Sequence, residues 1–256
     1  MSFVLCLILD YWKIKHVLLL IFLSIVHHAN LAKVKFYLFL IPHLVPHNVL
    51  ILYIVMFGGI APIVSYAHYK YFVTFIDDFS CFTWVYFLWA KAEVFSVFKQ
   101  FLALIETQFS TSIKVLCSDF GREYMSNEFQ DFLQSKWIIS QCSCSSTPQQ
   151  NSVVEWKNCH LLDELRTLLL DSSVSPRFWC KTLSTAVHLI NRLPSPMLNH
   201  VSPFSKLFGH SSLYYDLRTF GCVCFVHLPT HEWHKLTAQS IKCDFLGYAI
   251  PHKGYV

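Results

Sequence analysis

Two carboxylates, Asp119 and Glu155, could take part in chemistry on a phosphodiester. Asp119 directly follows the apolar segment 113–117, a predicted strand, and Glu155 opens a long helical pattern after a polar loop. Thirty-five residues lie between the two acids. Nucleotidyl transfer uses clustered carboxylates because two Mg²⁺ ions, about 3.5–4 Å apart, must be held against the phosphate by hard oxygen ligands. The spacing alone is also compatible with a solvated Asp and a Glu favoured by a helix dipole.

The cysteines give a weaker signal. The chain has 10 cysteines at irregular spacings, which is not typical of a disulfide scaffold at a length of 256 residues. Cys142 and Cys144, and again Cys222 and Cys224, form C-x-C pairs. Paired zinc ligands are usually spaced two to four apart and need a second pair, so we interpret these residues as scattered thiols in a reducing compartment.

Hydrophobic periodicity predicts the elements that would position the two acids. Aromatic and β-branched runs on either side of Asp78–Ser80 predict a β-hairpin over 71–88. Apolar residues then return at helical spacing from Ala92 to Ser110, which indicates an amphipathic helix. Further predicted strands cover 113–117, 138–141, 221–227 and 242–247, and further helices cover 127–134, 153–170 and 178–193. This order indicates an α/β fold with a mixed sheet flanked by helices, followed by the start of a small β-rich domain.

The composition is uneven along the chain. Hydrophobic residues make up 54% and charged residues 14%, whereas a soluble domain has about 25% charged residues. The excess lies in residues 1–60, but the apolar runs Val17–Val26 and Val49–Ile60 are shorter than the ~20 residues of a membrane span. We therefore do not expect a membrane segment, although a membrane-associated protein stays open as an alternative. The net charge of +4 permits a nucleic-acid partner.

Several motifs occur together in a fixed order. They are YFVTFIDDFS at 71–80, SDFGREY at 118–124, STPQQN at 146–151 and VEWKN at 154–158, followed by LRTFGC at 217–222, FLGY at 245–248 and KGY at 253–255. This series resembles the integrase core of copia-type LTR retrotransposon Pol polyproteins and the segment that follows that core. The resemblance runs from about residue 60 to the end of the chain.

The resemblance implies a ribonuclease-H-like core with a mixed five-stranded sheet. It also implies a D, D-35-E site that holds Mg²⁺ or Mn²⁺ and joins element DNA to host DNA, with DNA as the partner, no small-molecule substrate and a homo-oligomeric assembly. By position, Asp119 is the second catalytic and metal-binding acid and Glu155 the third. The nucleic-acid-binding residues it implies are Gln150, Asn151, Lys157 and Asn158. The implied compartment is the nucleus or the cytoplasm.

The first acid of that site is missing. The family's opening segment ends in a Gly followed by an Ala-Pro pair, which fits Gly59–Pro62 and places the acid at Met56. A thioether is a soft, poor ligand for Mg²⁺. Asp77 and Asp78 lie in the turn of the next hairpin, where Asp ordinarily forms side-chain hydrogen bonds to the backbone. We therefore predict a catalytically inactive copy.

Other departures from the family pattern point the same way. The family has Arg where this chain has Cys81, Cys117, Cys142, Trp156 and Cys159, and it has Gly at Arg122, Trp137 and Ser152. We expect backbone strain wherever such a glycine served a positive φ angle. The predicted organisation is a degenerate apolar segment at 1–55, the integrase core at 56–200, and a linker with a truncated β-rich region at 201–256. A non-catalytic nucleic-acid-binding module stays open as an alternative; its candidate cations are Lys91, Lys99, Lys114, Lys157 and Arg166.

Overall fold

The computed structural model describes residues 50–56, 63–119, 121–142, 152–229, 236 and 238–248, with the backbone alone described at 50–56 and 152–154. A five-stranded mixed sheet has the order β3-β2-β1-β4-β5. Its strands are β1 (Leu50–Met56), β2 (Tyr71–Asp77), β3 (Thr83–Leu88), β4 (Ile113–Ser118) and β5 (Ile139–Cys142). β1, β2 and β3 pair antiparallel, whereas β4 pairs parallel with both β1 and β5. A meander followed by two parallel crossovers is the ribonuclease-H-like arrangement, as predicted.

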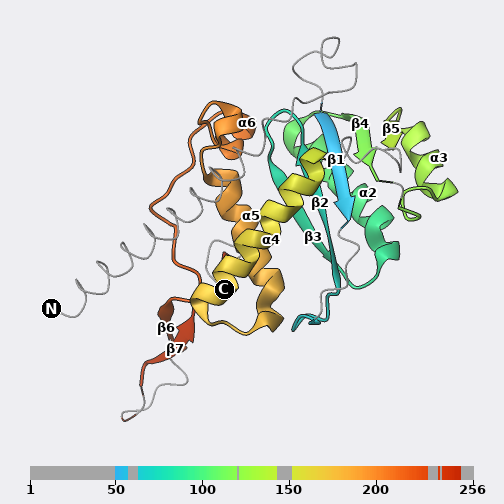
Figure 1. Ribbon diagram of the computed structural model, residues 1–256. Helices are drawn as coiled ribbons and strands as arrows, with labels where there is room; N and C mark the ends of the chain where they lie inside the picture. Colours follow the sequence, from blue (N-terminus) through green and yellow to red (C-terminus); the bar gives the residue numbers. More distant parts are fainter. Residues whose placement is uncertain are drawn as a thin grey trace.

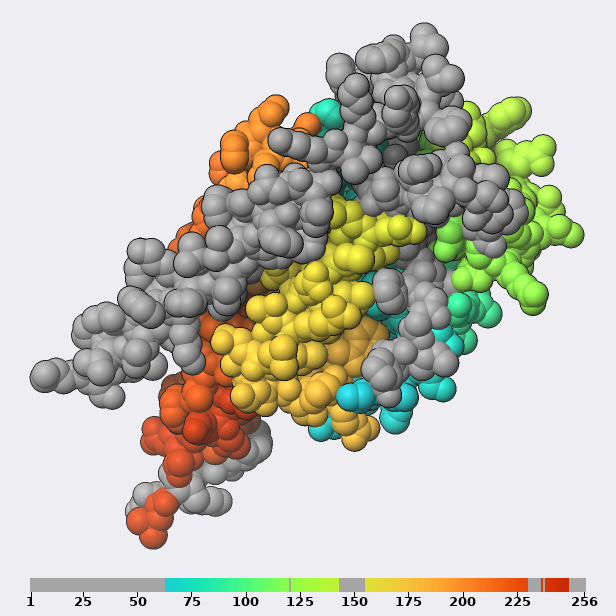
Figure 2. Space-filling view, in the orientation of Figure 1, coloured from blue at the N-terminus to red at the C-terminus, as the bar shows by residue number. Residues whose placement is uncertain are grey.

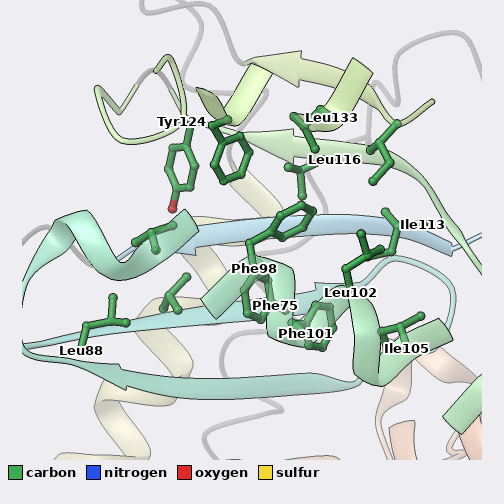
Figure 3. Packing of buried hydrophobic residues seen from close by; sticks show 14 residues of the cluster. Phe75, Leu88, Phe98, Phe101, Leu102, Ile105, Ile113, Leu116, Tyr124 and Leu133 are labelled. Carbon is green, nitrogen blue, oxygen red and sulfur yellow. The ribbon is translucent and has the colours of Figure 1, made fainter. Parts of the chain in front are cut away.

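Helices cover both faces of this sheet (Figure 1). α2 (Val94–Phe109) and α3 (Asn127–Ser135) lie on one face. Their buried side chains form a core with the odd-numbered residues of β2, in which the rings of Phe75 and Phe101 stack with centroids 4.2 Å apart. Phe98 and Leu116 pack into the same cluster (Figure 3). This cluster fills the space between the sheet and the helices α2 and α3.

The opposite face is covered by α4 (Ser152–Ser172) and α5 (Trp179–Arg192). Phe72 of β2 packs there against Leu161 of α4 and Trp179 of α5. Because successive strand residues point to opposite faces, β2 supplies Phe72 to the α4 side and Val73 to the α2 side. The sheet is therefore buried on both faces, as a sheet with parallel crossovers requires.

The predicted core elements are confirmed with small shifts at their ends. β1 begins at Leu50 and ends at Met56, the residue at which the predicted core begins. Pairing with β2 and β4 draws part of the apolar run 49–60 into an extended strand. The other apolar run, 17–26, lies outside the described residues. In the described part of the chain, none of the helices combines the length and the apolar character that a membrane crossing requires.

After α5 the chain continues through the short helix α6 (Pro203–Phe208) to a two-stranded antiparallel ribbon. This ribbon consists of β6 (Val223–His227) and β7 (Ser240–Asp244) and lies beside the C-terminal end of α4 (Figure 1). Gly221 makes that approach possible, since a Cβ at this position would lie 2.4 Å from the Cβ of Ser172. Its φ of +74° is also one that glycine adopts without strain. The strands predicted at 221–227 and 242–247 are confirmed as β6 and β7, although β6 begins at Val223 and β7 covers Ser240–Asp244.

Trp137, which replaces an expected glycine, adopts a left-handed backbone with φ +57° and is 87% exposed. It ends the turn between α3 and β5, and the side chain gains no packing in return for the strain. We expect Trp137→Gly to stabilise the fold by about 1 kcal/mol, because a bulky L-residue in this region costs about 1–2 kcal/mol. Urea unfolding of both proteins measures the difference. Trp137→Ala, which keeps the Cβ, is the control; an equal gain from Ala would show that removal of the exposed indole, rather than backbone strain, is responsible.

Candidate active site

Asp119 lies immediately after β4, at the carboxyl end of that strand. It is exposed, and its Oδ1 accepts a hydrogen bond from the backbone N–H of Gly121 at 3.2 Å. A Cβ on Gly121 would lie 3.1 Å from Oδ1 of Asp119 and 3.1 Å from Oε1 of Glu123, so the two carboxylates flank this glycine. Partial burial and then the charge of Glu123 raise the pKa of Asp119, while the Gly121 N–H and Lys91 lower it. Asp119 thus belongs to a small acidic turn.

Glu155 lies in the first turn of α4 and is exposed. An acid here is favoured by the unpaired N–H groups at the start of the helix. α4 packs on one face of the sheet. Asp119 belongs to the same face, because it lies two positions beyond Cys117 and strand residues two positions apart share a face. Both predicted acids thus project from well-formed elements of the fold.

The first carboxylate of such a site is missing from β1, whose sequence LILYIVM contains no acid at any position. Backbone register narrows the place where an acid would be needed. Position 56 pairs with Val73, which is in the core under α2, whereas position 55 pairs with Thr74, the next row. Position 53 pairs with Cys117, so a continuation of the parallel register by two residues sets position 55 abreast of Asp119. The row on the α4 side is therefore that of position 55.

Asp77 does not substitute for the lost acid. It is 2% exposed, and its Oδ2 accepts hydrogen bonds from the backbone N–H of Ser80 at 2.9 Å and from the Ser80 hydroxyl. The Cys81 N–H donates to the Asp77 carbonyl at 2.8 Å. The predicted turn role of Asp77 is confirmed.

Two of the residues that follow Glu155, Lys157 and Asn158, face inward, whereas Cys159 is exposed. Lys157 is 6% exposed and Asn158 is 5% exposed, so neither presents its side chain on a surface that DNA could reach. Both side chains lie on the side of α4 that packs on the sheet, and their predicted role in nucleic-acid binding stays a prediction. Desolvation by burial lowers the pKa of Lys157, and the neighbouring Cys81 raises it. The other two predicted DNA contacts, Gln150 and Asn151, lie outside the described residues.

Three of the remaining cations of the predicted basic face have local contacts, whereas Lys114 is exposed. Nη1 of Arg166 lies 2.9 Å from Oδ1 of Asp163, and Nζ of Lys99 lies 4.1 Å from the centre of the Phe95 ring. Lys91 lies over the ring of Tyr71 at 5.9 Å. These local contacts are ordinary for surface cations.

The described residues do not fit a two-metal centre. Among them, no group of three or more His, Cys, Asp and Glu side chains is close enough to hold a metal ion. Two acids remain where three are needed, and β1 offers only apolar and aromatic residues. Because Mg²⁺ requires several hard oxygen ligands, the arrangement is that of an incomplete site.

The fold and the incomplete acid site together define the class. Residues 56–148 match the integrase core domain, and residues 222–256 match the retroviral polymerase SH3-like domain. The chain therefore carries an integrase core of a retrotransposon Pol polyprotein.

Its homologues include copia-type Pol polyproteins of plant transposons. The Pol polyprotein of transposon RE2 from Arabidopsis thaliana is 39% identical over 196 residues, which is 77% of this chain and 13% of that protein. The Pol polyprotein of transposon TNT 1-94 from Nicotiana tabacum is 40% identical over 186 residues, or 73% of this chain and 14% of that protein. The chain thus spans about a seventh or less of the length of these relatives. The predicted resemblance is confirmed.

Solved structures with a similar fold include viral integrases. The HTLV-2 integrase catalytic core domain in complex with magnesium is 21% identical, with a TM-score of 0.46, and the match covers 64% of this chain and 98% of that one. A simian T-cell lymphotropic virus intasome bound to the PP2A regulatory subunit B56 gamma is 18% identical, with a TM-score of 0.49, over 77% of this chain and 68% of that one. The integrase core family generally depends on divalent metal and binds DNA.

Proposed function

We propose that this chain is a catalytically silent copy of a retrotransposon integrase, descended from an enzyme that joined element DNA to target DNA. The observation that carries the proposal is the first strand of the sheet, which holds no carboxylate anywhere along LILYIVM. Asp119 and Glu155 are the remaining members of the ancestral triad. Strand transfer needs the complete set, because the metal ions must stabilise both the attacking and the leaving oxygen.

The loss does not depend on how β1 is aligned with the family. Position 56, chosen from the Ala-Pro pair, is methionine, and position 55, chosen from the strand register, is valine. Neither side chain offers an oxygen ligand. Asp77 lies opposite Leu52, three residues from position 55, and its Oδ2 accepts hydrogen bonds from Ser80.

Weak DNA binding is a property that the chain could keep without catalysis. The described surface gives it little support, since Lys157 is buried and Arg166 is paired with Asp163. We therefore propose the silent integrase over a dedicated DNA-binding module.

The test is a strand-transfer assay with the full chain, labelled DNA ends and a supercoiled target, in Mg²⁺ and separately in Mn²⁺. We expect no joined product above the protein-free background, and no further decrease in Glu155→Gln. A gel-shift measurement on the same samples reports DNA binding separately. Joined product that requires both metal and Glu155 would overturn the proposal.

A further inference from the structure

Two thiols lie directly opposite each other in the β6–β7 ribbon. The register pairs Cys224 of β6 with Cys243 of β7. Hydrogen bonds from Phe245 N to Cys222 O at 2.8 Å and from Leu228 N to Gln239 O at 3.0 Å show which cross-strand pairs are the hydrogen-bonded ones. Because such pairs alternate along an antiparallel ladder, the pair between them, 224 and 243, is also hydrogen-bonded.

That position sets the distance between the two residues. Cα atoms of a hydrogen-bonded antiparallel pair are about 5.5 Å apart, which falls in the ~4.4–6.8 Å range spanned by disulfides; the opposed Cβ atoms, about 5.5 Å apart, must approach by about 1 Å to close the bond. Side chains of directly opposed residues project on the same side of the ribbon. Cys222 lies diagonal to Cys243, opposite Phe245, and diagonal neighbours are about 7–8 Å apart. The geometry therefore selects Cys224 over Cys222 as the partner of Cys243.

The two cysteines are accessible to reagents, and the two-stranded ribbon that carries them is only marginally stable by itself. Cys224 and Cys243 are both partly exposed, and neither is in a disulfide. Apolar residues of the ribbon are exposed beside them, with Phe225 67% and Ile241 52% accessible. Figure 2 shows the ribbon projecting from the body of the molecule below α4. An isolated two-stranded ribbon is only marginally stable, so a covalent tie between the strands would change its order considerably.

We propose that Cys224 and Cys243 are a redox modification site, which forms a cross-strand disulfide under oxidising conditions and opens again under reducing ones. With hydrogen peroxide as the oxidant, the two S–H bonds break, one S–S bond forms, and the two electrons and two protons reduce peroxide to two molecules of water. A small-molecule thiol reverses the step by exchange and leaves as its own disulfide. The closed form ties β6 to β7 around the connection between them.

The thiol chemistry determines the conditions of the test. Partial burial, then the proximity of Cys243 and Asp244, raises the pKa of Cys224. Because the thiolate is the reacting species, a mildly alkaline buffer accelerates the reaction.

The experiment uses the full chain, treated with limiting hydrogen peroxide, blocked with an alkylating reagent and digested with trypsin. Cleavage after Arg218, Lys235, Lys242 and Lys253 puts Cys224 in the 219–235 peptide and Cys243 in the 243–253 peptide. We expect these two peptides to be the predominant linked pair, and a thiol reductant to separate them. Cys222→Ser is the matched control, since it changes the other cysteine of the first peptide.

The proposal requires that Cys222→Ser keep the linked pair and that Cys224→Ser lose it. The reverse pattern would overturn it, as would linkages spread evenly over the other cysteines of the chain. A guanidinium-unfolded sample separates geometry from intrinsic reactivity, because the preference for this pair should disappear there. Linkage that is unchanged on unfolding would contradict the cross-strand origin of the pair.

Discussion

Val55→Asp is expected to create a response to Mg²⁺ that the unmodified chain lacks. Continuation of the strand register by two residues sets position 55 abreast of Asp119, on the face of the sheet that α4 covers, and Glu155 lies in the first turn of α4. A third carboxylate in this row supplies the missing hard ligand. A metal ion that binds only the folded state, present at a concentration of about 100 times its Kd, raises the free energy of unfolding by about 2.7 kcal/mol. That increase raises the Tm by several degrees for a chain of this size.

The measurement is thermal unfolding of each variant in EDTA and in excess Mg²⁺. Met56→Asp is the matched control, because position 56 pairs with Val73, a residue of the core under α2, and so belongs to the other row of the strand. We expect Met56→Asp to lower the Tm without any effect of metal. The Val55→Asp shift should disappear when Glu155 is also changed to Gln. A metal-dependent shift in Met56→Asp, and none in Val55→Asp, would restore the alignment that places the acid at 56.

Lys157→Met is expected to stabilise the folded chain at neutral pH by about 1–4 kcal/mol, as replacement of buried charged groups by apolar ones has done elsewhere. Lys157 is 6% exposed, and no carboxylate of the described residues lies within ion-pair distance. Burial lowers its pKa below the ordinary 10.5, so the folded state gives up the proton at a lower pH than the unfolded state does. Methionine matches the aliphatic stem and removes the desolvated ammonium.

The pH dependence gives a sharper readout. Between the lowered folded-state pKa and 10.5, the unfolded chain binds more protons than the folded chain, so stability rises with pH in that window. Denaturant unfolding at a series of alkaline pH values should show this rise in the unmodified chain and a flatter profile in Lys157→Met. Lys181→Met, at an exposed position of α5, should leave the profile unchanged. A loss of stability in Lys157→Met would mean that the ammonium has a favourable partner.

Much of the core could be predicted from the sequence because its signals are local. The 3.6-residue spacing of Val94, Phe98, Phe101 and Ile105 predicts the buried face of α2, and all four are buried. The turn at Asp77 follows from side-chain chemistry that acts within a few residues. A positive φ at Trp137 could be inferred because a glycine was expected there.

Tertiary structure decided the rest, since it depends on partners far apart in the chain. An apolar run at 49–60 does not reveal whether it forms a strand, and only pairing with β2 and β4 makes Leu50–Met56 the centre of the sheet. Lys157 looks like a surface cation in sequence, yet the rotation of α4 on the sheet buries it. The opposition of Cys224 and Cys243 likewise follows from register. The sequence by itself determined that β1 carries no acid; the structure determined which of its positions would need one, because only pairing with neighbouring strands assigns a residue to a face.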